Sequence, residues 1–94
     1  MYSKDRDLEG GLYIGAPVLF RGSVLGELHK EPGRILAERD SLTEREIYEF
    51  GLIGRYRLLV VLSDGATVPT SSNEITLLTE EEFKQEVLEY ELQR

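Results

Sequence analysis

Few side chains in this sequence could do chemistry, because its 94 residues include one histidine, His29, and no cysteine. A zinc or iron site draws mainly on several histidine and cysteine ligands, so His29 alone predicts no transition-metal site. A serine hydrolase would need His29 as its base and a Gly-x-Ser-x-Gly turn, which does not occur. The glycine patterns of dinucleotide and phosphate-binding loops are also missing. We therefore expect no cofactor and no enzymatic activity, while a carboxylate pair acting as acid and base stays open.

Six glutamates between residues 80 and 91 are the sharpest charged feature. Thr79 and Glu82 match the capping box that begins a helix, and apolar residues follow at helical spacing, which predicts a helix over 79–93. We expect its apolar side to pack on a sheet and its glutamates to form an acidic ridge. The ridge is either a solvated helix face or a docking surface for a basic protein.

Tyrosines and arginines form a second candidate surface. Tyr48 and Tyr56 could line a groove for a peptide together with Tyr13 and Phe20, although Phe20 also fits a core position. Arg57 follows Tyr56 and would either pair with a glutamate of the chain or contact a partner. The residues expected to bind a protein are therefore Glu82, Glu86, Glu89, Tyr48, Tyr56 and Arg57.

Short alternating apolar segments predict the strands that position these residues. The expected strands cover residues 17–21, 24–29, 56–63, 66–68 and 74–78. A capping box at Thr43 and a stop at Gly51 predict a short helix. Glu31-Pro32-Gly33 is expected to turn, and the rest of residues 30–42 stays open. Asp64-Gly65 predicts a tight hairpin turn with positive φ angles. The predicted core is Val18, Phe20, Val24, Leu28, Leu58, Val60, Leu62, Ile75 and Leu77.

These elements make one mainly β (α+β) domain over residues 10–94, preceded by a polar arm, 1–9, that we expect to be flexible. Gly15-Ala-Pro-Val-Leu-Phe, a return strand to Leu28 and Tyr56-Arg-Leu-Leu-Val-Val-Leu-Ser-Asp-Gly follow one another in the sequence, and Glu74-Ile-Thr-Leu-Leu comes last. In this order the chain resembles an SH3-like small barrel, as in Tudor and KOW-type domains. The resemblance implies about five antiparallel strands, an inserted helix, an added C-terminal helix and a binding function without catalysis.

A second resemblance is to the mammalian-cell-entry (MCE) lipid-transport domain. Gly11-Leu12, Gly15-Ala-Pro-Val-Leu-Phe-Arg-Gly, Val24-Leu-Gly-Glu-Leu and Val68-Pro69-Thr-Ser-Ser are similar to segments of that family. The resemblance implies a lipid-handling module that forms a hexamer around an apolar channel. The chain departs from the family in its charged insertion from His29 to Gly54 and in its acidic C-terminal helix, so this interpretation is second.

The overall charge limits the partners. With 31% charged residues and a formal net charge of −7, the chain repels phosphate backbones, and we expect no direct nucleic-acid binding. We also expect no membrane span and no signal peptide, and the lack of cysteine fits the cytoplasm. The expected function is a regulatory, inhibitory or assembly subunit that binds a larger protein with a basic surface. An MCE-like lipid-handling domain is the alternative, and a nucleic-acid mimic or nucleic-acid-associated factor is third.

Overall fold

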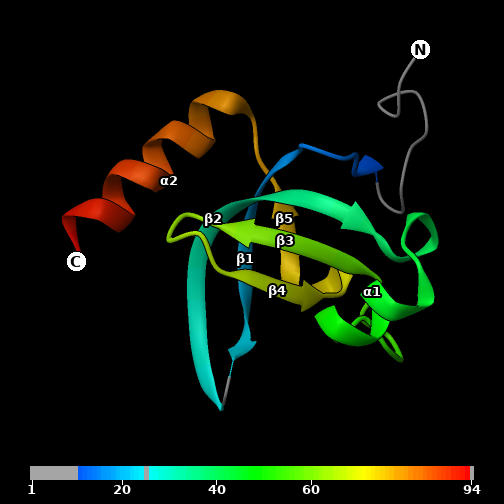
Figure 1. The fold of residues 1–94 in the computed structure, drawn as a ribbon. Coiled ribbons are helices and arrows are strands. Elements are labelled where there is room, and N and C mark those ends of the chain that lie inside the picture. The colour runs from blue at the N-terminus through cyan, green and yellow to red at the C-terminus, as the bar shows by residue number, and fades with distance from the viewer. Residues whose placement is uncertain (1–10, 25, 94) are drawn as a thin grey trace.

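The computed structural model describes residues 11–24 and 26–93 and contains one antiparallel sheet of five strands (Figure 1). Along the chain the elements are β1 Pro17–Val24, β2 Glu27–Glu38, α1 Glu44–Phe50, β3 Leu58–Leu62, β4 Thr67–Thr70, β5 Ile75–Leu77 and α2 Glu80–Leu92, with 3-10 turns at Arg39–Ser41 and Ser72–Glu74. The strand order is β4-β3-β2-β1-β5. The expected α+β class with an inserted and a C-terminal helix is confirmed. The sheet is open, because β4 and β5 lie at its two edges. The predicted arm, 1–9, lies outside the described residues.

The longest strand, β2, continues through a segment that the sequence predicts to turn. Glu31-Pro32-Gly33 does not reverse the chain, because β2 pairs with β1 without interruption from Glu27 to Arg34. The carbonyl oxygen of Pro32 accepts hydrogen bonds from Ser63, from its backbone N–H (3.1 Å) and its hydroxyl (2.9 Å). At Gly33 the neighbouring backbone approaches closely. Pairing with strands on both sides thus overrides the local turn signal.

The main apolar cluster lies on one face of the sheet. It confirms six predicted core residues: Val18, Phe20, Leu58, Val60, Leu62 and Ile75. Two other predictions are wrong. Leu28 is 88% exposed because it lies where β1 and β2 extend past the other strands, and Leu77 is 42% exposed at the end of the edge strand β5. The side chain of Val24, also predicted as core, lies outside the described part of the structure.

The turn between β3 and β4 contains Asp64 and Gly65, as predicted, but it is a three-residue loop. Leu62 and Ala66 close the loop, since the N–H of Leu62 donates to the carbonyl of Ala66 (2.8 Å). The N–H of Gly65 donates to the carbonyl of Leu62 (2.9 Å), and the Asp64 carboxylate accepts the N–H of Ala66 (2.9 Å). Gly65 has a φ of +92°, which fits the loop type in which a left-handed residue follows a type I turn.

Replacing Gly65 by valine is expected to lower the free energy of unfolding by about 1–2 kcal/mol, because a β-branched residue resists a left-handed backbone. No atom lies within 4 Å of a Cβ built at this position, so the cost is conformational rather than steric. Urea denaturation measures the change. Gly65→Asn is the matched control and should cost less, since asparagine tolerates this region. A valine variant as stable as the wild type would contradict the observed turn.

Both helices have the predicted ends. Thr43 with Glu46, and Thr79 with Glu82, form capping boxes in which each side chain accepts the other residue's backbone N–H. Gly51 ends α1 with a φ of +75°. Figure 1 shows α2 on the side of β1 and β2, whereas α1 lies beside β4 on the other side of the molecule.

Candidate functional site

Arg34 of β2 anchors the beginning of the acidic helix α2. Its guanidinium group donates to both carboxylate oxygens of Glu80 (2.9 and 3.1 Å) and lies 4.4 Å from the centre of the Phe83 ring. It also donates to the carbonyl oxygen of Gly15 (3.0 Å). The hydrogen bonds from Arg34 lower the pKa of the Glu80 carboxyl below its ordinary value. No residue of α2 is fully buried, and Arg34 and Glu80 are themselves 38% and 59% exposed, so α2 is held at the surface of the sheet.

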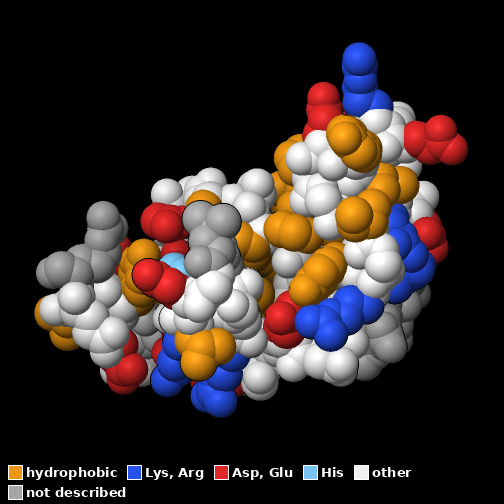
Figure 2. All heavy atoms as spheres, turned by 90° about the horizontal axis from the view of Figure 1, so that it is seen from below, with side chains coloured by type: hydrophobic (Ala, Val, Ile, Leu, Met, Phe, Trp, Pro, Cys, Tyr) orange, Lys and Arg blue, Asp and Glu red, His pale blue; other side chains and the backbone are white. Residues whose placement is uncertain are grey.

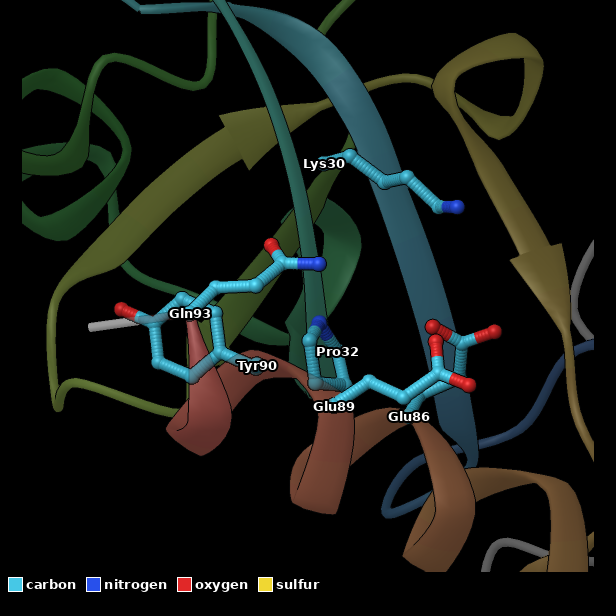
Figure 3. A pocket seen from close by; sticks show the side chains of 6 residues that line it. All are labelled: Lys30, Pro32, Glu86, Glu89, Tyr90 and Gln93. Carbon is cyan, nitrogen blue, oxygen red and sulfur yellow. The ribbon is translucent and has the colours of Figure 1, made fainter.

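Of the three glutamates predicted to bind a partner, Glu82 also has a role inside the fold. Glu82 accepts the N–H of Thr79 (2.8 Å) within the capping box. Glu86 is half-buried and, with the exposed Glu89, borders a pocket of about 40 Å³ between α2 and β2. In Figure 3, Lys30 and Pro32 come from β2, Glu86, Glu89 and Tyr90 come from α2, and Gln93 is the residue directly after it. Glu82 and Glu89 are both exposed, so the ridge stays accessible to a partner at these two positions.

Glu31 of β2 is a buried carboxylate that the sequence analysis does not single out. Its carboxylate has two hydrogen-bond partners. The backbone N–H of Asp64 donates to it (3.3 Å), and it also forms a hydrogen bond with the side chain of Tyr90 in α2. Burial raises the pKa of the Glu31 carboxyl above its ordinary value, and the Asp64 carboxylate adds to the rise, while the two hydrogen bonds and His29 oppose it. Glu31 thus joins β2 to the β3–β4 turn and to α2.

Replacing Glu31 by glutamine is expected to change how stability depends on pH. Since the folded pKa lies above the ordinary value of 4.5, ionisation of Glu31 opposes folding, and the wild type loses stability as the pH rises from 4.5 through the folded pKa. Glu31→Gln keeps an acceptor oxygen and has no such loss. The difference in stability, variant minus wild type, should therefore rise with pH and then level off. Glu80 is present in both proteins, so its contribution to the pH dependence cancels in this difference. Urea denaturation of both proteins across this pH range measures the difference in stability. A difference that stayed constant or fell with rising pH would refute the expectation.

The second candidate surface contains three exposed apolar side chains on α1 and directly after it. Tyr48 is 82% exposed, Ile53 is 61% exposed and Phe50 is 37% exposed. We call these three residues the α1 patch. Figure 2 shows hydrophobic side chains gathered at this end of the molecule, on the right of the view, with Lys and Arg side chains beside them. Gathered apolar surface marks an interaction site more often than isolated side chains do.

The segment that carries Ile53 is attached to the sheet by buried and polar contacts. Leu52 is completely buried, and its N–H donates to the carbonyl oxygen of Ile47 in α1 (2.9 Å). The Arg39 side chain donates to the carbonyl oxygens of Leu52 (3.3 Å) and Gly54 (3.0 Å). Ile53 is therefore exposed on a segment whose backbone is held in place by these contacts.

Tyr56 and Arg57, the other predicted residues at this end, make contacts within the chain. Tyr56 is half-buried, and the Arg55 guanidinium lies 5.1 Å from the centre of its ring. Arg57 forms ion pairs with Glu38 (3.4 Å) and Asp40 (3.0 Å), while 43% of its side chain stays exposed. Arg57 thus adopts the first of its two predicted roles, pairing within the chain, and retains surface for a partner.

The structure places the six predicted binding residues in two separate groups. Glu82, Glu86 and Glu89 lie on α2, beside β1 and β2, whereas the two tyrosines and Arg57 lie on or near the α1 side. Sequence reasoning missed Phe50 and Ile53. The available signal was a pair of apolar residues on either side of the Gly51 helix stop, outside any predicted strand.

Within residues 11–24 and 26–93, no group of histidine, cysteine or acidic side chains is arranged to hold a metal ion. In the same described ranges, no helix is long and apolar enough to cross a membrane. No protein-family model matches the chain, and neither the curated proteins nor the solved structures include a significant match. Function is therefore inferred from the chain's own residues.

Proposed function

We propose that this chain is a non-enzymatic protein-binding module, acting as a regulatory, inhibitory or assembly subunit, and that the α1 patch contacts its partner. The supporting observation is the exposure of Tyr48, Phe50 and Ile53 on a helix and loop whose backbone is held in place. Burying an exposed isoleucine or phenylalanine contributes about 1.5–3 kcal/mol. A partner that covered the patch would recover this free energy.

Aromatic and arginine side chains beside the patch support the same proposal. Protein interfaces are enriched in tyrosine and arginine and depleted of lysine and acidic residues at their centres. Tyr56, with Arg55 over its ring, and the half-exposed Arg57 follow the patch in the chain. We propose Tyr48 as the central contact, with Tyr56 and Arg57 at its border.

The acidic helix has a different role in this proposal. Six glutamates on α2 and a net charge of −7 favour encounter with a basic partner, and such steering weakens as salt increases. Glu82 and Glu89 are exposed and suited to this role, although the Glu82 carboxylate also caps α2, and the half-buried Glu86 adds charge beside them. The lack of cysteine supports a cytoplasmic location as part of the same proposal.

A solid interior supports protein binding over lipid handling. Val18, Phe20, Ile35 and Val60 are at most 2% exposed and fill the described interior with one apolar cluster. The lipid-handling alternative requires an apolar channel, which would have to form between copies of the chain. A nucleic-acid mimic would need carboxylates at phosphate-like spacing, and ion pairing of Glu80 and capping by Glu82 reduce those available on α2.

Site-specific cross-linking tests the proposal. A photoreactive phenylalanine analogue is placed at Tyr48 and, as a matched control on the same helix, at the exposed Glu49. After illumination in extract of the native cell, an adduct of one defined mass is expected for position 48 and a much weaker one for position 49. Equal adducts at both positions, or none at position 48, would contradict the role of the patch.

A double variant provides the complementary measurement. Tyr48→Ser with Ile53→Ser is expected to keep the melting temperature of the wild type, because both side chains are exposed, and to lose the adduct-forming partner in affinity capture. Leu92→Ser is the control, since Leu92 is 84% exposed on α2. Retention of the partner by the double variant would rule out the α1 patch as the contact.

A further inference from the structure

The β1–β2 hairpin extends past every other described strand. β5 pairs with β1 only at residues 18–20, and β3 pairs with β2 only at residues 33–38. Residues 21–24 and 27–30, which we call the hairpin arm, therefore pair only with each other among the described strands. Figure 1 shows the arm reaching beyond the rest of the sheet at the bottom of the view. Its outer edges consequently present backbone groups to solvent.

The direction of these backbone groups follows from the pairing. The N–H and carbonyl of Ile35 bond toward the β1 side, whereas the carbonyl of Pro32 accepts Ser63 on the β3 side. Alternation along an antiparallel strand then directs the N–H and C=O groups of Leu28 and Lys30 away from β1. No described strand lies along that edge. The backbone groups of Leu28 and Lys30 on this side of β2 therefore have no strand beside them beyond the end of β3.

The other two sheet edges are poor templates for a further strand. β4 contains Pro69, which has no N–H to donate, and β5 has only three residues. Short length and proline are both devices that limit edge-to-edge pairing. The β2 edge of the arm is longer, and Leu28, at 88% exposed, leaves an apolar side chain uncovered beside it. Among the β4, β5 and β2 edges, the β2 edge of the arm is therefore the most competent to accept a strand.

Carboxylates surround this edge on both faces of the hairpin. The pocket contacts place Glu86 and Glu89 beside Lys30 on the α2 face. The hydrogen bond from Asp64 to the buried Glu31 places the β3–β4 turn beside the same strand, and Glu27 lies at the arm's outer end. These carboxylates outnumber the two basic side chains of the arm, Lys30 and Arg21, so the surroundings carry a net negative charge that complements a basic segment.

We propose that the Leu28–Lys30 edge of β2 binds an extended, lysine- or arginine-containing segment of a partner protein, which adds to the sheet as a strand. Main-chain hydrogen bonds to Leu28 and Lys30 supply register, and an apolar residue of the segment covers the Leu28 side chain. Its basic side chains pair with the carboxylates on either face. This surface is separate from the α1 patch, so either can fail experimentally without affecting the other.

Amide hydrogen exchange by NMR tests strand addition directly. The probe is a synthetic peptide of about nine residues that alternates lysine and valine, and its control alternates glutamate and valine. The lysine peptide is expected to slow exchange of the Leu28 and Lys30 amides by about fivefold or more, with a much smaller change at His29, whose N–H bonds β1. The glutamate peptide should have no effect. Absence of selective protection with the lysine peptide would overturn the proposal.

A matched pair of variants separates strand addition from simple charge attraction. Leu28→Pro removes the N–H that points away from β1. The hydrogen bonds between β1 and β2 should remain, because Pro32 occupies an equivalent outward-facing position in the same strand. Leu28→Ala removes the side chain but keeps the N–H. Protection of the Lys30 amide by the peptide should survive in Leu28→Ala and be largely lost in Leu28→Pro. Equal protection of the Lys30 amide in both variants would overturn the proposal. Protection that appears without peptide and grows with protein concentration would also overturn it, because it would mean that a second copy of the chain pairs with this edge.

Discussion

Replacing Phe20 by alanine is expected to lower the free energy of unfolding by about 3–5 kcal/mol, which is enough to unfold much of a domain of this size. Phe20 is 2% exposed at the centre of the main apolar cluster. Its ring also lies over Gly22, where a Cβ would meet ring atoms at 2.5 and 2.7 Å. Truncation would therefore remove core contacts and leave a cavity that the tightly packed β1 backbone cannot easily fill.

Leu28→Ala is the matched control for this measurement. Sequence alternation assigns Phe20 and Leu28 equally to the core, but Leu28 is 88% exposed on the hairpin arm. We therefore expect Leu28→Ala to change the free energy of unfolding by less than about 0.5 kcal/mol in urea denaturation. A large effect of Leu28→Ala together with a small effect of Phe20→Ala would contradict the observed packing.

Gly33→Ala is expected to destabilise the fold by about 3 kcal/mol, the upper end of the range for overpacked sites. A Cβ at this position would lie 2.6 Å from the carbonyl oxygen of Val61 and 3.0 Å from a side-chain carbon of Val60. Because the nearest atom belongs to the backbone of β3, relief requires the two strands to move apart. That movement would strain the pairing of Gly33 with Leu62.

Thermal and urea denaturation measure this effect, and Gly65→Ala is the comparison. A Cβ at Gly65 meets no atom within 4 Å, so that variant carries only the cost of a positive φ, about 1 kcal/mol. Gly33→Ala should therefore be the less stable of the two. The reverse order would mean that β2 and β3 are less closely apposed at this point than the structure indicates.

Local signals in the sequence determined the helix ends and most of the core. The capping boxes at Thr43 and Thr79 and the stop at Gly51 depend on residues within one turn of each other, so they can be read without knowing the fold. The same holds for the interior strand β3, whose continuous apolar run predicts burial on both faces. The glutamates of α2 and the exposed Tyr48 could also be identified as surface candidates.

Only the tertiary structure decided the features that depend on partners distant in the chain. β2 extends through Pro32 and Gly33 because β1 and β3 pair with it, and Arg34 anchors a helix that begins 46 residues later at Glu80. The same pairing sets where neighbouring strands stop, and so decides that Leu28 is exposed while Phe20 is buried. Alternation along a strand specifies which side chains share a face, but whether that face is covered depends on contacts between segments far apart in sequence.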